Sequence, residues 1–167
     1  MLALEITSMK SFMNQLLAGD AFDIFLLEEA VITAANTITL DGHLNREFFS
    51  SEELEAGRVP DYEYSPWSTM KGLCFQLMKG KRTPLSFRFV LHVKPELTER
   101  LLIKAGCSVD PSQIKALVLI IRYDGSKAIL TTGCAYRTFL MNKEPENIWD
   151  DALKRHLSGK NIPYEIL

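Results

Sequence analysis

Residues 115–125 read Lys-Ala-Leu-Val-Leu-Ile-Ile-Arg-Tyr-Asp-Gly, the longest apolar run of the chain followed by a turn signal. Residues 115–123 are rich in Val, Ile and Leu and apolar on both faces, which predicts a central strand of a sheet. Asp124-Gly125 then predicts a tight hairpin turn, because both centre positions of a type I′ turn need a positive φ. The chain must return as one or two strands over 127–140, where Gly133 can form a bulge or break.

Strand and helix patterns continue upstream. Over Leu85–Val93 the apolar side chains fall on one face and Arg88 and His92 on the other, which predicts a half-buried strand. Pro95 predicts the start of a helix and Gly106 its end. Further strands are predicted over 2–6, 24–33 and 36–40, and the spacing of apolar residues over 9–17 predicts an amphipathic helix.

The remaining segments complete an α+β fold. Asp41-Gly42 predicts a second hairpin turn, with a strand over His43–Phe49 after it. Residues 50–80 predict a helical turn, an acidic loop and a helix opened by Ser65-Pro66. Pro145 starts a C-terminal helix over 145–158, before a short tail or strand. We expect a single domain over 1–167, with a mainly antiparallel sheet and about four helices.

The composition excludes several classes of protein. The chain has 167 residues, 47% hydrophobic and 24% charged, and a formal net charge of -2. These values exclude disorder and give no support to a strongly basic nucleic-acid-binding domain. No apolar run reaches the roughly 18–20 residues of a membrane helix, and we expect no membrane association and no signal peptide. Cys74, Cys107 and Cys134 show no C-x-x-C spacing, which predicts reduced thiols and a cytoplasmic location.

The order of the expected elements occurs twice, over about 1–50 and 85–140. A shift of 87 residues aligns Leu4 with Leu91, Leu16 with Ile103 and Gly19 with Gly106. A doubled β-α-β-β-β unit resembles a single domain of the DNA sliding-clamp family. The resemblance implies helices on one side of a curved sheet.

In the sliding-clamp family the helices face DNA and carry basic residues. Here the first helix offers only Lys10, and the acids Glu96 and Glu99 offset the bases Arg100 and Lys104 of the matching helix. Because affinity for duplex DNA depends on neutralising several phosphates, these helices predict little of it.

A second resemblance rests on four stretches of sequence. They are Phe-Leu-Leu-Glu-Glu-Ala (25–30), Ile-Thr-Leu-Asp-Gly-His-Leu (38–44), Lys-Gly-Lys-Arg-Thr-Pro-Leu-Ser-Phe (79–87) and Ile-Arg-Tyr-Asp-Gly (121–125). In these stretches the chain resembles a small bacterial family of uncharacterised proteins. That resemblance implies no activity.

Charge is unevenly distributed along the chain. Residues 41–63 hold seven acids and two bases, net -5, whereas 71–104 hold eight bases and two acids, net +6. The candidate anion- or nucleic-acid-binding residues are Lys79, Lys81, Arg82 and Arg88. Two other interpretations remain open, because cations favour a helix C-terminus and because the basic segment can face the acidic one.

Several other residues fit a structural role as well as a functional one. Asp41 and His43 fit either a turn or a general base or metal-ligand pair, and His156 fits a hydrogen-bonded structural histidine. Tyr62, Tyr64 and Trp67 fit either a peptide-binding surface or anchors that hold the acidic loop to the core. The sequence names no catalytic residue, no metal site and no cofactor.

We therefore expect a non-enzymatic, clamp-like binding module, associated with DNA or replication through its basic patch. One alternative is a small enzyme with a site near Asp41 and His43. The other is an oligomer, or a module that binds a protein partner, with an open sheet edge as its interface.

Overall fold

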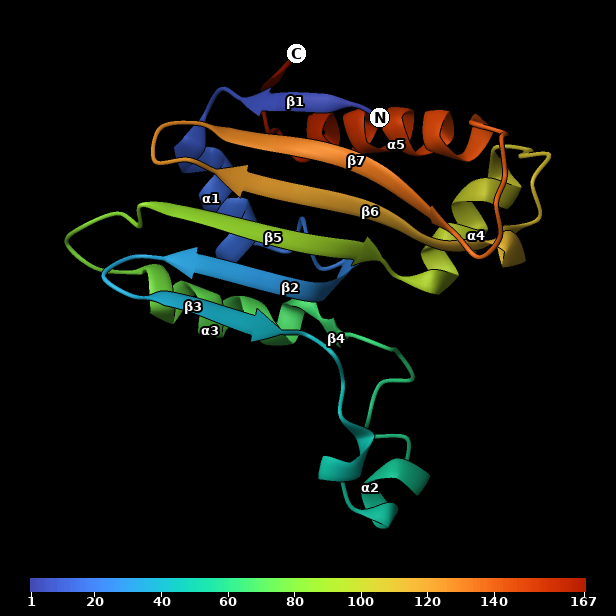
Figure 1. Ribbon diagram of the computed structural model, residues 1–167, viewed down its shortest axis with the longest axis horizontal. Helices are drawn as coiled ribbons and strands as arrows, with labels where there is room; N and C mark the ends of the chain where they lie inside the picture. The colour runs from blue at the N-terminus through green and yellow to red at the C-terminus, as the bar shows by residue number, and fades with distance from the viewer.

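One antiparallel sheet carries the fold of the computed structural model, which describes residues 1–167 (Figure 1). Its strands are β1 (Ala3–Ile6), β2 (Phe25–Thr33), β3 (Thr37–Asp41), β4 (Ser65–Pro66), β5 (Ser86–Val93), β6 (Ile114–Tyr123), β7 (Ala128–Tyr136) and β8 (Tyr164–Ile166). They lie in the order β3-β2-β5-β6-β7-β1-β8, and β4 pairs with β2 beside this path. The predicted α+β class is confirmed, and β6 lies at the centre as predicted.

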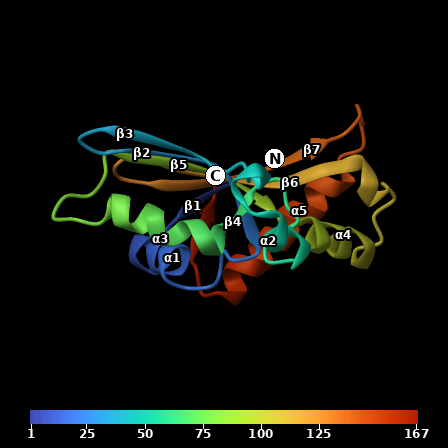
Figure 2. The ribbon, with the colours of Figure 1, turned by 90° about the horizontal axis from the view of Figure 1, so that it is seen from below.

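The helices cover only one face of the sheet. The longer ones are α1 (Met9–Leu17), α3 (Trp67–Met78), α4 (Pro95–Lys104) and α5 (Glu144–Gly159). Figure 2 shows all four beneath the sheet, with the opposite face free of helices. The short α2 (Ser51–Glu55) brings the number of α-helices to five, and it lies away from the sheet. The free face of the sheet is called the open face below.

The hydrophobic core lies between the sheet and the helix layer. Alternate side chains of β5, including Phe87, Phe89 and Leu91, are buried against the helices, as their spacing predicts. Trp67 is fully buried, and its Nε1 donates to the carbonyl of Leu16 at 2.9 Å, which links α3 to α1. Burial of such an aromatic side chain stabilises the fold by about 3 kcal/mol.

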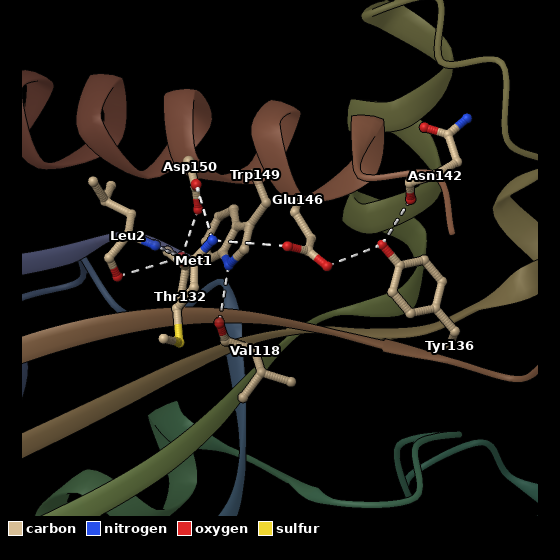
Figure 3. Close-up of polar contacts among 9 residues, drawn as sticks. All are labelled: Met1, Leu2, Val118, Thr132, Tyr136, Asn142, Glu146, Trp149 and Asp150. Carbon is tan, nitrogen blue, oxygen red and sulfur yellow. Dashed lines mark hydrogen bonds and ion pairs between the residues drawn. The ribbon is translucent and has the colours of Figure 1, made fainter. Parts of the chain in front are cut away.

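Polar contacts fix α5 against the central strands (Figure 3). The indole Nε1 of Trp149 donates to the carbonyl of Val118 at 2.9 Å, and Thr132 Oγ1 donates to Asp150 Oδ1 at 2.5 Å. These bonds join α5 to β6 and β7 at defined positions. The C-terminal helix therefore has a specific register on the sheet.

The Asp41-Gly42 hairpin turn was a wrong prediction. The chain reverses instead around Ala34, whose amide donates to the carbonyl of Asn36 at 3.0 Å, and β3 continues to Asp41. Gly42 is needed for a different reason. A Cβ there would lie 1.8 Å from the carbonyl oxygen of Leu27, so only glycine permits this approach to β2.

The strand predicted over His43–Phe49 is also wrong. His43 makes only an isolated bridge to Tyr64, and a 3-10 turn follows over Arg46–Phe48. Ser65-Pro66 forms β4 beside β2, and α3 therefore starts at Trp67. Pairing with β2 therefore displaced the predicted helix start at Ser65-Pro66.

The internal repeat stays a prediction. Strands β5, β6 and β7 of the second unit are neighbours, whereas β1 of the first unit lies on the far side of them from β2 and β3. Leu16 is fully buried, but Ile103, which the shift of 87 residues aligns with it, is 63% exposed. The clamp-like arrangement likewise stays a prediction.

Candidate functional site

The acidic segment forms a projection from the sheet. Residues 44–63, which we call the arm, include α2 and extend away from β3 and β4 (Figure 1). At the root of the arm the amide of Leu44 donates to the carbonyl of Glu63 at 2.9 Å. Inside the arm, Arg46 Nη2 donates to the carbonyl of Pro60 at 2.8 Å and to Asp61 Oδ1 at 2.9 Å.

Aromatic side chains anchor this part of the chain. The hydroxyl of Tyr62 donates to Glu96 of α4, and this bond, together with burial, raises the pKa of Tyr62 to about 12. The ring of Tyr64 lies 5.0 Å from that of His92, and Trp67 is buried. These contacts favour the anchoring interpretation over a peptide-binding surface.

The four sequence-predicted basic residues divide into two groups. Lys79 follows α3, and Lys81 and Arg82 are exposed in the loop before β5. Arg88 lies on the open face, where its Nη1 is 3.0 Å from Glu29 Oε2. The arm and this loop occupy different regions of the molecule, so the acidic segment does not cover the basic one (Figures 1 and 2).

The structure places two further cations beside Arg88. Arg88 lies directly opposite Arg122 of β6, and Lys127 follows the hairpin between β6 and β7. The three side chains border a hollow of about 370 Å³ on the open face, which we call the basic cleft. Val31 and Ile129 extend the same row across β2 and β7.

Arg122 is the unusual member of the basic cleft. Arg88 pairs with Glu29 and Lys127 with Glu5, whereas Arg122 is exposed and has no ion-pair partner. Like charges directly opposite each other on neighbouring strands are destabilising, so an anion between Arg88 and Arg122 would be favourable. Sequence reasoning missed Arg122 because no hairpin joins β5 to β6, so their register is not readable from the sequence.

A second polar cluster lies at the root of the arm. Glu28, Glu29, Asp41, His43 and Tyr64 border a hollow of about 420 Å³, and His92 Nε2 contacts Glu28 Oε2. A bulge in β2 between Leu27 and Glu29 inserts an extra residue, Glu28, at this place. Asp41 Oδ1 accepts the amide of His43 at 2.9 Å, which is local turn chemistry.

The electrostatics of this cluster follow from its excess of carboxylates. Burial raises the pKa of Tyr64, and the nearby charges of Glu28, Glu63 and Asp41 raise it further. The phenol therefore stays protonated and able to donate. No group of three His, Cys, Asp or Glu side chains has a geometry that could hold a metal ion. His92 and Glu28 are in contact, so a proton can pass between the imidazole and the carboxylate.

Comparison with known proteins places the chain in a family. Residues 15–165 match the model of DUF5721, a family of unknown function. The chain belongs to the DUF5721 family. This confirms the resemblance to an uncharacterised family. Neither curated proteins nor solved structures include a match to the chain.

Three further titratable side chains of this DUF5721 protein, those of Cys74, Cys134 and His156, contact the core or the backbone. Burial raises the pKa of the Cys74 and Cys134 thiols to about 11, so both stay protonated near neutral pH. His156 Nε2 lies 2.6 Å from the carbonyl of Ala21, which confirms the structural role predicted for it. No helix combines the length and the apolar character needed to cross a bilayer.

Proposed function

We propose that the protein is a non-enzymatic binding module and that its basic cleft binds the phosphate backbone of a nucleic acid. The observation that carries this proposal is the Arg88–Arg122 pair, two guanidinium groups directly opposite each other on the open face. Guanidinium groups bind phosphate oxygens through two parallel hydrogen bonds. A phosphate between these arginines would replace their mutual repulsion with two attractive contacts.

The surroundings of the cleft support an extended ligand. No helix covers the open face, so a polymer can lie across it (Figure 2). The ion pairs of Arg88 and Lys127 are partly exposed, and such pairs contribute little, so a phosphate can compete with them.

The net charge of -2 does not oppose this function. The acidic excess is concentrated in the arm, away from the cleft (Figure 1). Screening at physiological ionic strength limits the reach of exposed charges to about 8 Å. The charges at the cleft are therefore those of Arg88, Arg122 and Lys127, of their carboxylate partners Glu29 and Glu5, and of Asp124, and Arg122 is the one cation there without an ion-pair partner.

A salt titration of DNA binding tests the proposal. Fluorescence anisotropy of labelled single- and double-stranded oligonucleotides should show binding at low ionic strength, with log K falling linearly with log salt. Arg122→Ala should weaken binding and reduce the slope by about 1, because one phosphate contact is lost. Arg100→Ala, which removes an exposed arginine of α4, is the matched control and should change neither.

Two results would contradict the proposal. One is the absence of binding to either oligonucleotide at the lowest salt concentration. The other is an equal loss of affinity in Arg122→Ala and Arg100→Ala, which would indicate diffuse charge attraction. A role of Lys79, Lys81 and Arg82 in DNA binding stays a prediction, and a triple Ala variant tests it in the same titration.

The His92–Glu28 contact favours a second candidate function, general acid–base catalysis at the root of the arm. Turnover of a panel of ester and phosphoester substrates is the measurement. Glu28→Gln should reduce turnover by about 100-fold or more. The control Glu165→Gln removes an exposed carboxylate of β8 and should not. Absence of turnover across the panel would contradict this candidate.

A further inference from the structure

A small apolar pocket lies on the helix side of the sheet, near the start of β5. It has a volume of about 250 Å³ and is bordered by side chains of α1, the end of α3, the following loop and two strands. The apolar members are Met9, Met13, Met78, Pro84, Phe87 and Tyr123. This volume is below the roughly 300–1,000 Å³ of small-molecule sites, so it suits one large side chain. Methionine side chains adapt readily to such an occupant.

The rim of this pocket is basic. Lys10 borders the pocket, Lys79 directly follows Met78, and Arg82 directly precedes Thr83, another bordering residue. These three cations and Lys81 are exposed, and none forms an ion pair. An apolar floor with a basic rim is complementary to an aromatic side chain that carboxylates surround.

The arm presents such a side chain. Phe48 is 84% exposed and belongs to the 3-10 turn of the arm, where its ring lies 5.4 Å from that of Phe49. The arm carries six acids against two bases, Arg46 and Arg58. The acids are Glu47, Glu52, Glu53, Glu55, Asp61 and Glu63. The arm therefore offers an exposed aromatic ring within a strongly acidic segment.

The arm cannot fill the pocket of its own molecule. Phe87 of the pocket pairs with Ile32, near the turn that joins β2 to β3. The chain then runs the length of β3, away from that turn, before the arm leaves the sheet after Asp41 (Figure 1). The pocket and the arm consequently lie at opposite ends of β3. An occupant with the chemistry of the arm must come from another molecule.

We propose that the arm of one copy docks into the basic-rimmed pocket of a second copy, with Phe48 as the inserted side chain. The arm carboxylates would then face Lys10, Lys79, Lys81 and Arg82 of the second copy. Because the two complementary surfaces lie on different parts of the chain, the contact is head-to-tail and builds a ring or an open chain of copies. This inference does not rest on DNA binding, since the rim cations Lys10, Lys79, Lys81 and Arg82 are not members of the basic cleft, although Phe87 and Tyr123 border both hollows.

Light scattering after size exclusion tests the contact over a series of protein concentrations. At low salt the mass should rise with concentration above the monomer value of 18.9 kDa, and high salt should lower it. Phe48→Ser should remain monomeric because it loses the inserted ring. Lys81→Glu with Arg82→Glu should also remain monomeric, and these exposed loop positions are not part of the core. Phe139→Ser, at a residue that is 89% exposed outside the arm, is the matched control and should assemble like the parent.

A mixing experiment makes the test specific. The Phe48→Ser variant keeps an intact pocket, and the Lys81→Glu, Arg82→Glu variant keeps an intact arm. An equimolar mixture should therefore form a complex of twice the monomer mass and no larger species. A monomeric parent at every concentration, assembly that persists in both variants, or a mixture that stays monomeric would each overturn the proposal.

Discussion

The dipeptide Asp-Gly occurs at two places in the molecule and has a different role at each. At Asp124-Gly125 it makes the hairpin between β6 and β7: Gly125 has φ +99°, and Asp124 Oδ1 accepts the amides of Ser126 and Lys127 at 2.9 and 2.8 Å. At Asp41-Gly42 it ends β3, and Gly42 lies against the backbone of β2. The first glycine is required by its dihedral angle and the second by its lack of a side chain.

Each dipeptide borders one of the two polar regions. Asp124 and Lys127 lie beside the basic cleft, whereas Asp41 and His43 lie beside the carboxylate-rich hollow at the root of the arm. A substitution at either dipeptide should therefore change the stability of the fold and the neighbouring polar region. The other polar region should be unaffected. Substitutions at Gly42, Gly125 and Asp124 test this separation.

Gly42→Ala should be the most damaging single change. The new Cβ would meet the carbonyl oxygen of Leu27 at 1.8 Å, and the backbone atoms on both sides must move. We expect a loss of about 3 kcal/mol or more in the free energy of unfolding, measured by urea denaturation. Gly72→Ala, in the exposed part of α3 with nothing within 4 Å, is the control and should not destabilise. A loss below about 1 kcal/mol would show that β2 and the arm root can separate easily.

Gly125→Ala should have an intermediate effect. Its φ of +99° is unfavourable for a residue with a Cβ, and that Cβ would lie 3.0 Å from the carbonyl oxygen of Leu85. We expect a loss of about 1–2 kcal/mol in the same denaturation measurement. Gly125→Asn should lose less, because asparagine tolerates positive φ better than alanine. Equal losses in the two variants would contradict a role for the dihedral angle.

Asp124→Asn should give the smallest effect, and that effect should depend on pH. Hydrogen bonds from Lys127 and then Ser126 lower the pKa of Asp124 below its usual 3.8. A carboxyl group with a lowered pKa in the folded state contributes stability that is fully present above its unfolded pKa. This contribution disappears as the pH falls through the lower, folded pKa.

Denaturation midpoints of the parent and of Asp124→Asn should therefore differ at pH 7 and converge at acid pH below 3.8. Asparagine keeps a carbonyl acceptor for the turn, so the comparison isolates the charge. A difference that stays constant from pH 7 to acid pH would contradict this explanation.

The two dipeptides also differ in how far the sequence alone predicts their roles. Local patterns identified β5, β6, α4 and the hairpin after β6, because each depends on neighbours within a few residues. The type I′ geometry expected at Asp124-Gly125 is wrong, because Gly125 has a positive φ and Asp124 does not. The role of Gly42 depends on Leu27, which is distant in sequence, and the same dipeptide was therefore misread as a turn. The spacing of apolar residues along the sequence does not show which distant segments of the chain pack against each other.

In the candidate sites, too, some features depend on local sequence and others on contacts between distant residues. Arg88 was predicted from the charge of its segment, but its neighbour Arg122 depends on the register between β5 and β6. Similarly, the contact of His92 with Glu28 depends on the bulge in β2. The uneven charge of the chain was visible in the sequence. That the arm and the loop with Lys79, Lys81 and Arg82 lie apart followed only from the fold.

The most direct test of the account is to map the nucleic-acid contact by NMR. A short single-stranded oligonucleotide would be titrated into isotope-labelled protein at low salt, and backbone amide shifts would be followed. We predict the largest shifts at Arg88, Arg122, Lys127 and Ile129 around the basic cleft. Absence of shifts, or shifts confined to α4, α5 and the arm, would contradict the claim that the open face is the binding surface.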